Sequence, residues 1–350
     1  MIKVPMEDIF STTDFPGLVK SQTMIYDGHG EADCHISLGG QTTTDAANRN
    51  QKLRFDDTVS CVQSTGIYDN RLRNAAATSN GSEIRVTGGE LVDATTGETS
   101  LSDKIYKVNE NLSVTALTNS TFHVPSGYRI SALGHSMLSD LINCFIIGGE
   151  TQLNDGTDDI VPVKHMTRFR WDDSVSAYSD GLTLNQTSAI SCCGHNGAEG
   201  IIWRASGGGA AATTAEIFHP EKGMNSRLIA ELSTTFTQCA GMSACSEGDA
   251  AFRCDGYDVG SSTEVTTVRA LRYDDITTAL VMTNNLAYRM RQQFTASDGT
   301  SMMSVGGRSD ADSITFSTNA QSIKFDDSAT GIQHTNGINL GIRVGACASI

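Results

Sequence analysis

An apolar, strand-like segment that ends in two glycines recurs along the chain, and the first glycines of successive copies, with Gly256 in a degenerate copy, lie 49 to 60 residues apart. Its copies read CHISLGG, EIRVTGG, CFIIGG, IIWRASGG and MMSVGG, and a degenerate copy, AAFRCDG, fills the remaining gap. A repeat of this length cannot bury a hydrophobic face alone and must stack against its neighbours. The period therefore constrains the fold more than any single motif does.

Each copy after the first follows a short hydrophobic segment and a turn, such as SNGS (79–82) or SDG (297–299). Asn-Gly and Asp-Gly favour tight hairpins, so the two segments are expected to pair as antiparallel strands. A third strand then runs into paired acids, as in LRFDD, FRWDD, LRYDD and IKFDD, and a fourth strand follows. Each unit is thus predicted to be a four-stranded antiparallel meander, the blade of a β-propeller.

Six such units resemble the repeats of the kelch family over residues 31–350. The resemblance implies an all-β fold, a six-bladed β-propeller of four-stranded antiparallel blades. The double glycine would close the second strand of each blade, where small residues allow close approach and unusual backbone angles. The fourth-strand tryptophan of the family is missing. The structural glycines predicted in this way are Gly39, Gly40, Gly88, Gly89, Gly148, Gly149, Gly207, Gly208, Gly306 and Gly307.

The C-terminal segment LGIRVGACASI (340–350) looks like a first strand, whereas the first unit begins at its second strand, CHISLGG. We expect the C-terminal strand to complete the first blade and close the ring, which leaves no open ring edge. In the alternative, residues 20–28 supply that first strand and the C-terminal segment begins a partial seventh blade. Residues 1–30 form an N-terminal arm that packs on the propeller itself or on a neighbouring subunit.

The paired acids invite a catalytic or metal-binding interpretation, but their positions favour turns. In the other two units, Asn109-Glu110 and Pro220-Glu221 are assigned to the same place, and these are residues that a turn accepts. An aromatic residue in the third strand is expected to fill the wedge between blades. The predicted aromatics are Phe55, Tyr106, Trp171, Phe218, Tyr273 and Phe325.

The first strands of kelch blades carry an arginine, and the resemblance places Arg73, Arg129, Arg291 and Arg343 at this position. Inner strands line the central channel of a propeller, where guanidinium groups could bind carboxylates in a bidentate manner. These four residues are the predicted binding candidates. The alternative is that each arginine donates to backbone carbonyls of the next blade.

The net charge of -15 argues against nucleic acid and anionic membranes as partners, because both require a cationic surface. No apolar segment has the length of a transmembrane span, and residues 1–17 lack the apolar core of a signal peptide. The nine cysteines are scattered without CxxC spacing, which predicts free thiols in a reducing compartment. No motif predicts catalytic residues, a metal or another cofactor.

The sequence therefore favours a non-enzymatic structural or binding propeller in the virion or the cytoplasm. Its protein partners would be copies of itself or other subunits of a larger assembly. A composition rich in Thr, Ser, Asn, Gly and Ala, with only 6% aromatics, is typical of bacteriophage and other virion structural proteins, in the tail or associated with the capsid. One alternative is a mutarotase-like kelch enzyme that acts on acidic sugars. Another is an adaptor that binds an acidic peptide through the channel arginines.

Overall fold

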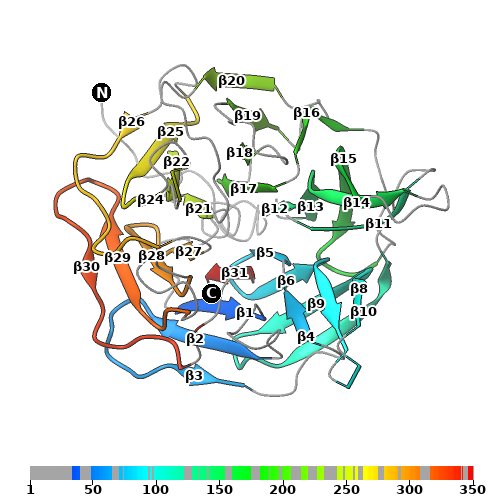
Figure 1. Cartoon of the computed structure of the whole chain (residues 1–350), viewed down its shortest axis with the longest axis horizontal. Coiled ribbons are helices and arrows are strands. Elements are labelled where there is room, and N and C mark those ends of the chain that lie inside the picture. Colours follow the sequence, from blue (N-terminus) through cyan, green and yellow to red (C-terminus); the bar gives the residue numbers. More distant parts are fainter. Residues whose placement is uncertain are drawn as a thin grey trace, which may run out of the picture.

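In the computed structural model, the regular elements of the described residues are all β-strands, and they surround a common axis in a propeller-like ring (Figure 1). No helix that could cross a membrane occurs in this part of the chain. The described residues are 34–39, 49–64, 71–73, 75–93, 95–96, 98–121, 128–133, 135–139, 142–153, 160–174, 182–188, 190–196, 199–205, 214–219, 227–231, 243–246, 249–254, 257–258, 263–274, 280–290, 293–307, 316–339, 341 and 346–349.

Five sheets have four antiparallel strands each, and we name each blade by its innermost strand. The β31 blade consists of β31 (Ala346–Ser349), β1 (Cys34–Leu38), β2 (Asn50–Arg54) and β3 (Val62–Gln63). The β5 blade consists of β5 (Ala76–Ser79), β6 (Glu83–Thr87), β9 (Lys104–Asn109) and β10 (Val114–Thr121).

The other three blades lie at the top and left of the ring in Figure 1. The β17 blade consists of β17 (Ile190–His195), β18 (Gly200–Ala205), β19 (Thr214–Phe218) and β20 (Arg227–Glu231). The β21 blade consists of β21 (Ser243–Ser246), β22 (Ala250–Cys254), β25 (Val268–Arg272) and β26 (Leu280–Val281). The β27 blade consists of β27 (Phe294–Ser297), β28 (Ser301–Val305), β29 (Ala320–Lys324) and β30 (Ile332–Gln333).

Between the β5 and β17 blades lies a sheet of six strands instead of four. The sheet has extra strands because β15 is 11 residues long. The C-terminal half of β15 pairs with β13, its first three residues pair with β14, and Val163 and His165 on its other edge pair with β16. The strands of this β12 sheet are β11 (Tyr128–Leu133), β12 (Ser136–Ser139), β13 (Asn143–Ile147), β14 (Glu150–Leu153), β15 (Ile160–Arg170) and β16 (Thr183–Ser188). Five blades thus have the predicted form, and six blades stay a prediction.

Two small sheets follow second strands of blades. One has the order β4 (Arg71–Arg73), β7 (Glu90–Val92) and β8 (Thr99–Leu101), and the other pairs β23 (Tyr257–Asp258) with β24 (Thr263–Glu264). In the β12 sheet, β11 and β14 are paired in the same way as β4 and β7. The segments just before the inner strands β5 and β12 therefore pair with the connection that follows the double glycine.

The C-terminal strand closes the ring as predicted. Strand β31 pairs antiparallel with β1, so that Ala348 lies opposite Ile36 and Ala346 lies opposite Leu38. Because β31 fills the innermost place of this blade, the alternative in which residues 20–28 fill it is wrong. Those residues and the predicted N-terminal arm, 1–30, lie outside the described residues.

Most of the hydrophobic core lies between neighbouring blades. One cluster joins Ile36 and Leu38 of the β31 blade to Ile84 and Val86 of the β5 blade, and similar clusters join other neighbours. Burial of these apolar faces supplies about 25 cal/mol per Å², so each blade is stabilised mainly by the blades beside it. The ring is thus the unit that folds, as a stacked repeat requires.

The double glycines turn the chain out of each second strand with positive φ. The first glycine has φ of 61° to 66° at Gly39, Gly88, Gly148 and Gly306, and the second has φ of 83° to 87° at Gly89, Gly149 and Gly307. The carbonyl of the second glycine accepts a hydrogen bond from Ser102, Val163 or Ser317 at the start of the next segment. Gly40, Gly207 and Gly208 lie outside the described residues.

Replacing Gly149 by alanine is expected to lower the free energy of unfolding by about 1–2 kcal/mol, because a Cβ at φ of 87° meets the neighbouring carbonyl. Asparagine tolerates this conformation better, so Gly149→Asn should cost less than Gly149→Ala. Urea denaturation of both variants measures the difference. Equal losses in the two variants would contradict a backbone origin for the effect.

Two of the predicted aromatics lie out of register with the others. Phe55, Trp171, Tyr273 and Phe325 directly follow their third strands, and Trp171 and Phe325 pack in clusters shared with the preceding sheet. Tyr106 lies inside β9, and Phe218 is the last residue of β19 itself. Both are buried. Asn109 pairs with Glu83 in the same way as Arg54 pairs with Cys34. The residue of the β5 blade that corresponds to Phe55 is therefore Glu110.

Candidate functional site

The two predicted binding arginines that the structure describes do not lie on inner strands. Arg73 lies on β4 opposite Glu90 of β7, and Arg129 lies on β11, which pairs with β14. The inner strands next to them are β5 and β12, so the first-strand placement of these two residues is wrong. Arg291 and Arg343 lie outside the described residues. A binding role for the four arginines stays a prediction.

The first acid of each DD pair stabilises its own turn. The Asp56 carboxylate accepts hydrogen bonds from the backbone N–H and hydroxyl of Thr58, and it forms an ion pair with Arg54 at 2.9 Å. Asp172 and Asp326 accept the N–H of the serine two residues later, and Asp274 forms an ion pair with Arg272 at 2.8 Å. These contacts are local, exposed and repeated, so this acid is part of the turn.

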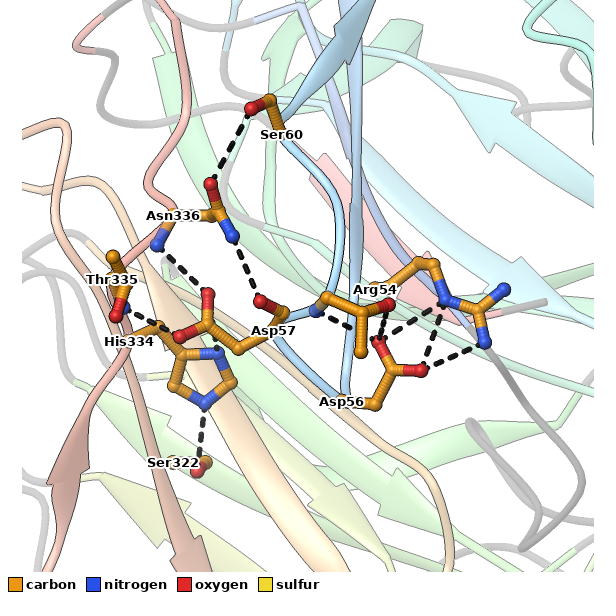
Figure 2. A network of polar contacts seen from close by, with 9 residues as sticks. Arg54, Asp56, Asp57, Ser60, Ser322, His334, Thr335 and Asn336 are labelled. Carbon is orange, nitrogen blue, oxygen red and sulfur yellow. Dashed lines mark hydrogen bonds and ion pairs between the residues drawn. The ribbon is translucent and has the colours of Figure 1, made fainter.

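The second acid binds the neighbouring blade. In Figure 2, the Asp57 carboxylate accepts the backbone N–H groups of Thr335 at 2.6 Å and Asn336 at 2.8 Å, and the Asn336 amide donates to the Asp57 carbonyl at 2.8 Å. Asp57 belongs to the β31 blade, whereas Thr335 and Asn336 follow β30 of the β27 blade. We call this arrangement a clasp. It joins residues 278 and 279 positions apart in the chain.

A second clasp has the same geometry one blade earlier. Asp327 accepts the N–H groups of Thr283 at 2.7 Å and Asn284 at 2.8 Å, and the Asn284 amide donates to the Asp327 carbonyl at 2.6 Å. Both donor segments are a Thr-Asn pair after a fourth strand, within HTN (334–336) and MTN (282–284). The Thr-Asn dipeptide that follows both fourth strands is the sequence signal that points to the clasps.

The turn equivalents assigned to the β5 blade are wrong by two residues. Leu112, with φ of 66°, takes the place of Asp57, Asp173 and Asp327, whose φ values are 53° to 55°. Its N–H donates to the carbonyl of Asn109 as that of Asp57 donates to Arg54, and Asn111 caps the N–H of Ser113. The equivalents are therefore Asn111 and Leu112 instead of Asn109 and Glu110. Pro220 and Glu221 lie outside the described residues.

The clasps keep their carboxylates ionised. Burial opposes ionisation of Asp57, but the N–H donors of Asn336 and Thr335 outweigh it, and the pKa of Asp57 lies below its usual 3.8. The N–H donor of Asn284 is the main reason why the pKa of Asp327 is also lowered. A carboxylate that accepts several N–H groups is more stable as an anion. Both clasps are thus fully charged at neutral pH.

A buried polar cluster lies near the axis, where three inner strands meet. Thr78 of β5 is 3.2 Å from Ser139 of β12 and 3.1 Å from Nε2 of His195 of β17. Ser139 donates to the carbonyl of Ser79, so its oxygen accepts from Thr78, and Thr78 in turn accepts from Nε2–H of His195. Full burial lowers the pKa of His195 to about 4, so this histidine is neutral and ties three strands together.

The outer rim exposes apolar side chains at matching positions. In three blades, an apolar residue of the fourth strand lies opposite the residue that stands two positions before the end of the third strand. The pairs are Val62 of β3 with Lys52, Ile332 of β30 with Ser322, and Leu280 of β26 with Ala270. Their exposed fractions are 58%, 57% and 50%. The three strands are outermost in three consecutive blades (Figure 1). We call Val62, Ile332 and Leu280 the apolar rim. Val59 and Val281 beside it are also half exposed.

Within the described ranges, no group of three or more His, Cys, Asp or Glu residues is arranged to hold a metal ion. No disulfide bond joins the cysteines whose side chains the structure describes, which are Cys34, Cys61, Cys144, Cys193, Cys254 and Cys347. Burial raises the pKa of Cys61 and therefore keeps that thiol protonated. Among the described side chains, those exposed to other molecules include the apolar residues of the rim and the ion pairs at the turns.

An all-β, propeller-like ring of antiparallel blades is the class of fold that these elements define. Among solved structures, the chain is similar to that of the protein YjhT, with a TM-score of 0.61 over 82% of this chain and 91% of YjhT. The two sequences are 13% identical, so the similarity shows a shared fold alone. No protein-family model matches the chain, and no curated protein matches it.

Proposed function

We propose that the chain is a non-enzymatic binding propeller that works as a subunit of a larger protein assembly. The apolar rim is the observation that supports this proposal. Three consecutive blades expose a large aliphatic side chain in the same register, on strands whose outer edges pair with no other described strand. An exposed apolar position that recurs in the same register of consecutive blades offers a partner a repeated set of apolar contacts, whereas a single exposed apolar residue needs no such explanation.

Within this proposal, the assembly is a virion, such as that of a bacteriophage, and the ring has six blades related to kelch repeats. The chain's composition and its net charge of -15 support the first point. The path β12, β13, β15, β16 supports the second, because it has the strand order of a blade, the double glycine Gly148-Gly149 and the acid pair Asp172-Asp173. The inner strands also contact each other in the order β31, β5, β12, β17, β21, β27 and back to β31.

Replacing Val62, Leu280 and Ile332 together by threonine is expected to abolish assembly and leave the ring folded. Threonine is chosen because the β5 blade already has an exposed threonine, Thr115 of β10, at the equivalent position. Thr115 lies opposite Lys107 as Val62 lies opposite Lys52. Exposed substitutions of this kind usually change stability by less than about 0.5 kcal/mol each. Light scattering after size exclusion reports assembly, and circular dichroism reports folding.

The matched control is Thr115→Val, which adds an apolar residue at the same register outside the rim and should leave assembly unchanged. A triple variant that assembles like the natural chain would refute a role for the rim. A natural chain that stays monomeric at all concentrations and is missing, by mass spectrometry, from purified virions would refute the virion proposal.

A further inference from the structure

The ring-closing clasp differs from the other clasp in one residue. His334 precedes Thr335, whereas Met282 precedes Thr283, and the N–H groups of His334 and Met282 bind equivalent carbonyls, Ala320 and Val268. His334 is 8% exposed, and its Nδ1 lies 3.9 Å from Oδ1 of Asp57 (Figure 2). A titratable ring therefore lies beside the carboxylate that closes the propeller.

The hydrogen bonds around His334 suit its neutral form. Nε2 lies 2.8 Å from the hydroxyl of Ser322, which can donate to the ring or accept from it. Nδ1 is too far from Asp57 for a hydrogen bond. Protonation would give Nδ1 a hydrogen that faces Oδ1 of Asp57, the same oxygen that accepts the N–H of Asn336. At 3.9 Å the charged ring can donate to this oxygen only if the ring and the carboxylate move closer together, and a carboxylate that moves toward the ring moves away from Asn336.

The other charged groups on the elements packed here are already paired or directed elsewhere. Arg54 and Asp56 pair with each other, and Lys52 pairs with Glu110 of the β5 blade. On β29, Lys324 and the following Asp326 are exposed, and Asp326 caps Ser328. The Cys61 thiol, whose carbonyl accepts from Asn339, stays protonated. His334 is thus the group at the clasp whose charge changes on mild acidification, whereas Asp57, with its pKa lowered below 3.8, stays ionised.

We propose that the Asp57 clasp is an acid-released closure of the ring, in which protonation of His334 withdraws the Asp57 carboxylate from the Thr335-Asn336 segment. Burial lowers the pKa of His334 below 6.5, and this effect exceeds the opposing attraction of Asp57. The unfolded chain therefore binds this proton at higher pH than the folded chain. The stability of the closure is complete above pH 6.5 and falls as the pH drops toward the folded pKa.

Backbone hydrogen exchange of the natural chain tests the proposal without any substitution. Protection of the Thr335 and Asn336 amides, corrected for intrinsic exchange, should fall between pH 7 and 5, by up to about tenfold per pH unit for one linked proton. The Thr283 and Asn284 amides of the Asp327 clasp are the internal control and should keep their protection. Equal behaviour of the two pairs of amides would overturn the proposal.

Exchanging the two residues before the Thr-Asn pairs provides the matched variants. His334→Met should remove most of the loss of protection at Thr335 and Asn336, because the chain already uses methionine at this position in the other clasp. Met282→His should introduce a new loss at Thr283 and Asn284. If His334→Met retains the full pH dependence of the natural chain, His334 is not the group that releases the clasp.

Discussion

Replacing Phe145 by alanine is expected to lower the free energy of unfolding by about 3–5 kcal/mol, the usual cost of emptying a buried phenylalanine site. Phe145 lies on β13 and is fully buried. Its ring meets that of Phe218 from the β17 blade edge to face, with centroids 5.6 Å apart and an interplanar angle of 75°. Such pairs add about 0.5–1.5 kcal/mol beyond burial, so the substitution weakens the contact between two adjacent sheets.

Urea denaturation followed by circular dichroism measures this loss. Phe145→Leu is the matched variant, since it keeps most of the apolar volume and should cost less than half as much. Ile142→Ala is the surface control, because Ile142 precedes the same strand and is 55% exposed. A loss below about 1 kcal/mol for Phe145→Ala would mean that this contact between sheets contributes little to the ring.

The repeat, the double glycines and the closing strand could be predicted because each depends on local pattern. Positive φ at Gly88 and Gly89 follows from a turn that only glycine makes without strain, and the short apolar runs before the double glycines specify the second strands. The closure by β31 followed from counting strands, since the first unit lacked its innermost strand. None of these inferences required knowledge of the side-chain contacts between blades.

The exact turn equivalents could not be predicted, because residue type does not determine the conformation there. Leu112 adopts the left-handed backbone that Asp57 and Asp327 adopt, although leucine is rare in this region. Only the pairing of Asn109 with Glu83 reveals the register. Tyr106 and Phe218 hold other register positions than the aromatics that follow their third strands, yet both pack against the preceding sheet, as the sequence predicted for an aromatic between blades.

The placement of Arg73 and Arg129 and the roles of Asp57 and the rim depend on contacts between distant segments. Strand β4 pairs with β7 across the whole hairpin of β5 and β6, so the segment before an inner strand need not belong to it. The paired acids were predicted to be turn residues, and the first acid is one. The second acid also binds a neighbouring blade, which no local pattern around Asp57 indicates.

Replacing Asp57 by alanine is expected to lower the free energy of unfolding by about 2–3 kcal/mol. Hydrogen bonds to charged acceptors contribute about 1.5–3 kcal/mol each, and the partial exposure of this carboxylate reduces the sum of its two short bonds. Asp56→Ala is the matched control at the adjacent position, since Asp56 makes only exposed contacts within its own turn. It should cause a much smaller shift in the urea midpoint.

The location of the loss distinguishes a closure from an ordinary turn contact. Asp57→Ala should lower amide protection in β31 and β1, because the β31 blade joins strands from both ends of the ring and the clasp holds that blade against the β27 blade. Asp327→Ala removes the same kind of clasp between segments only 43 and 44 residues apart, and β31 should keep its protection. The two clasps share the same three hydrogen bonds, so at neutral pH, where His334 is uncharged, a difference between the variants reports where each clasp lies in the ring. Unchanged protection of β31 in Asp57→Ala would show that strand pairing and the apolar cluster alone hold the ring closed.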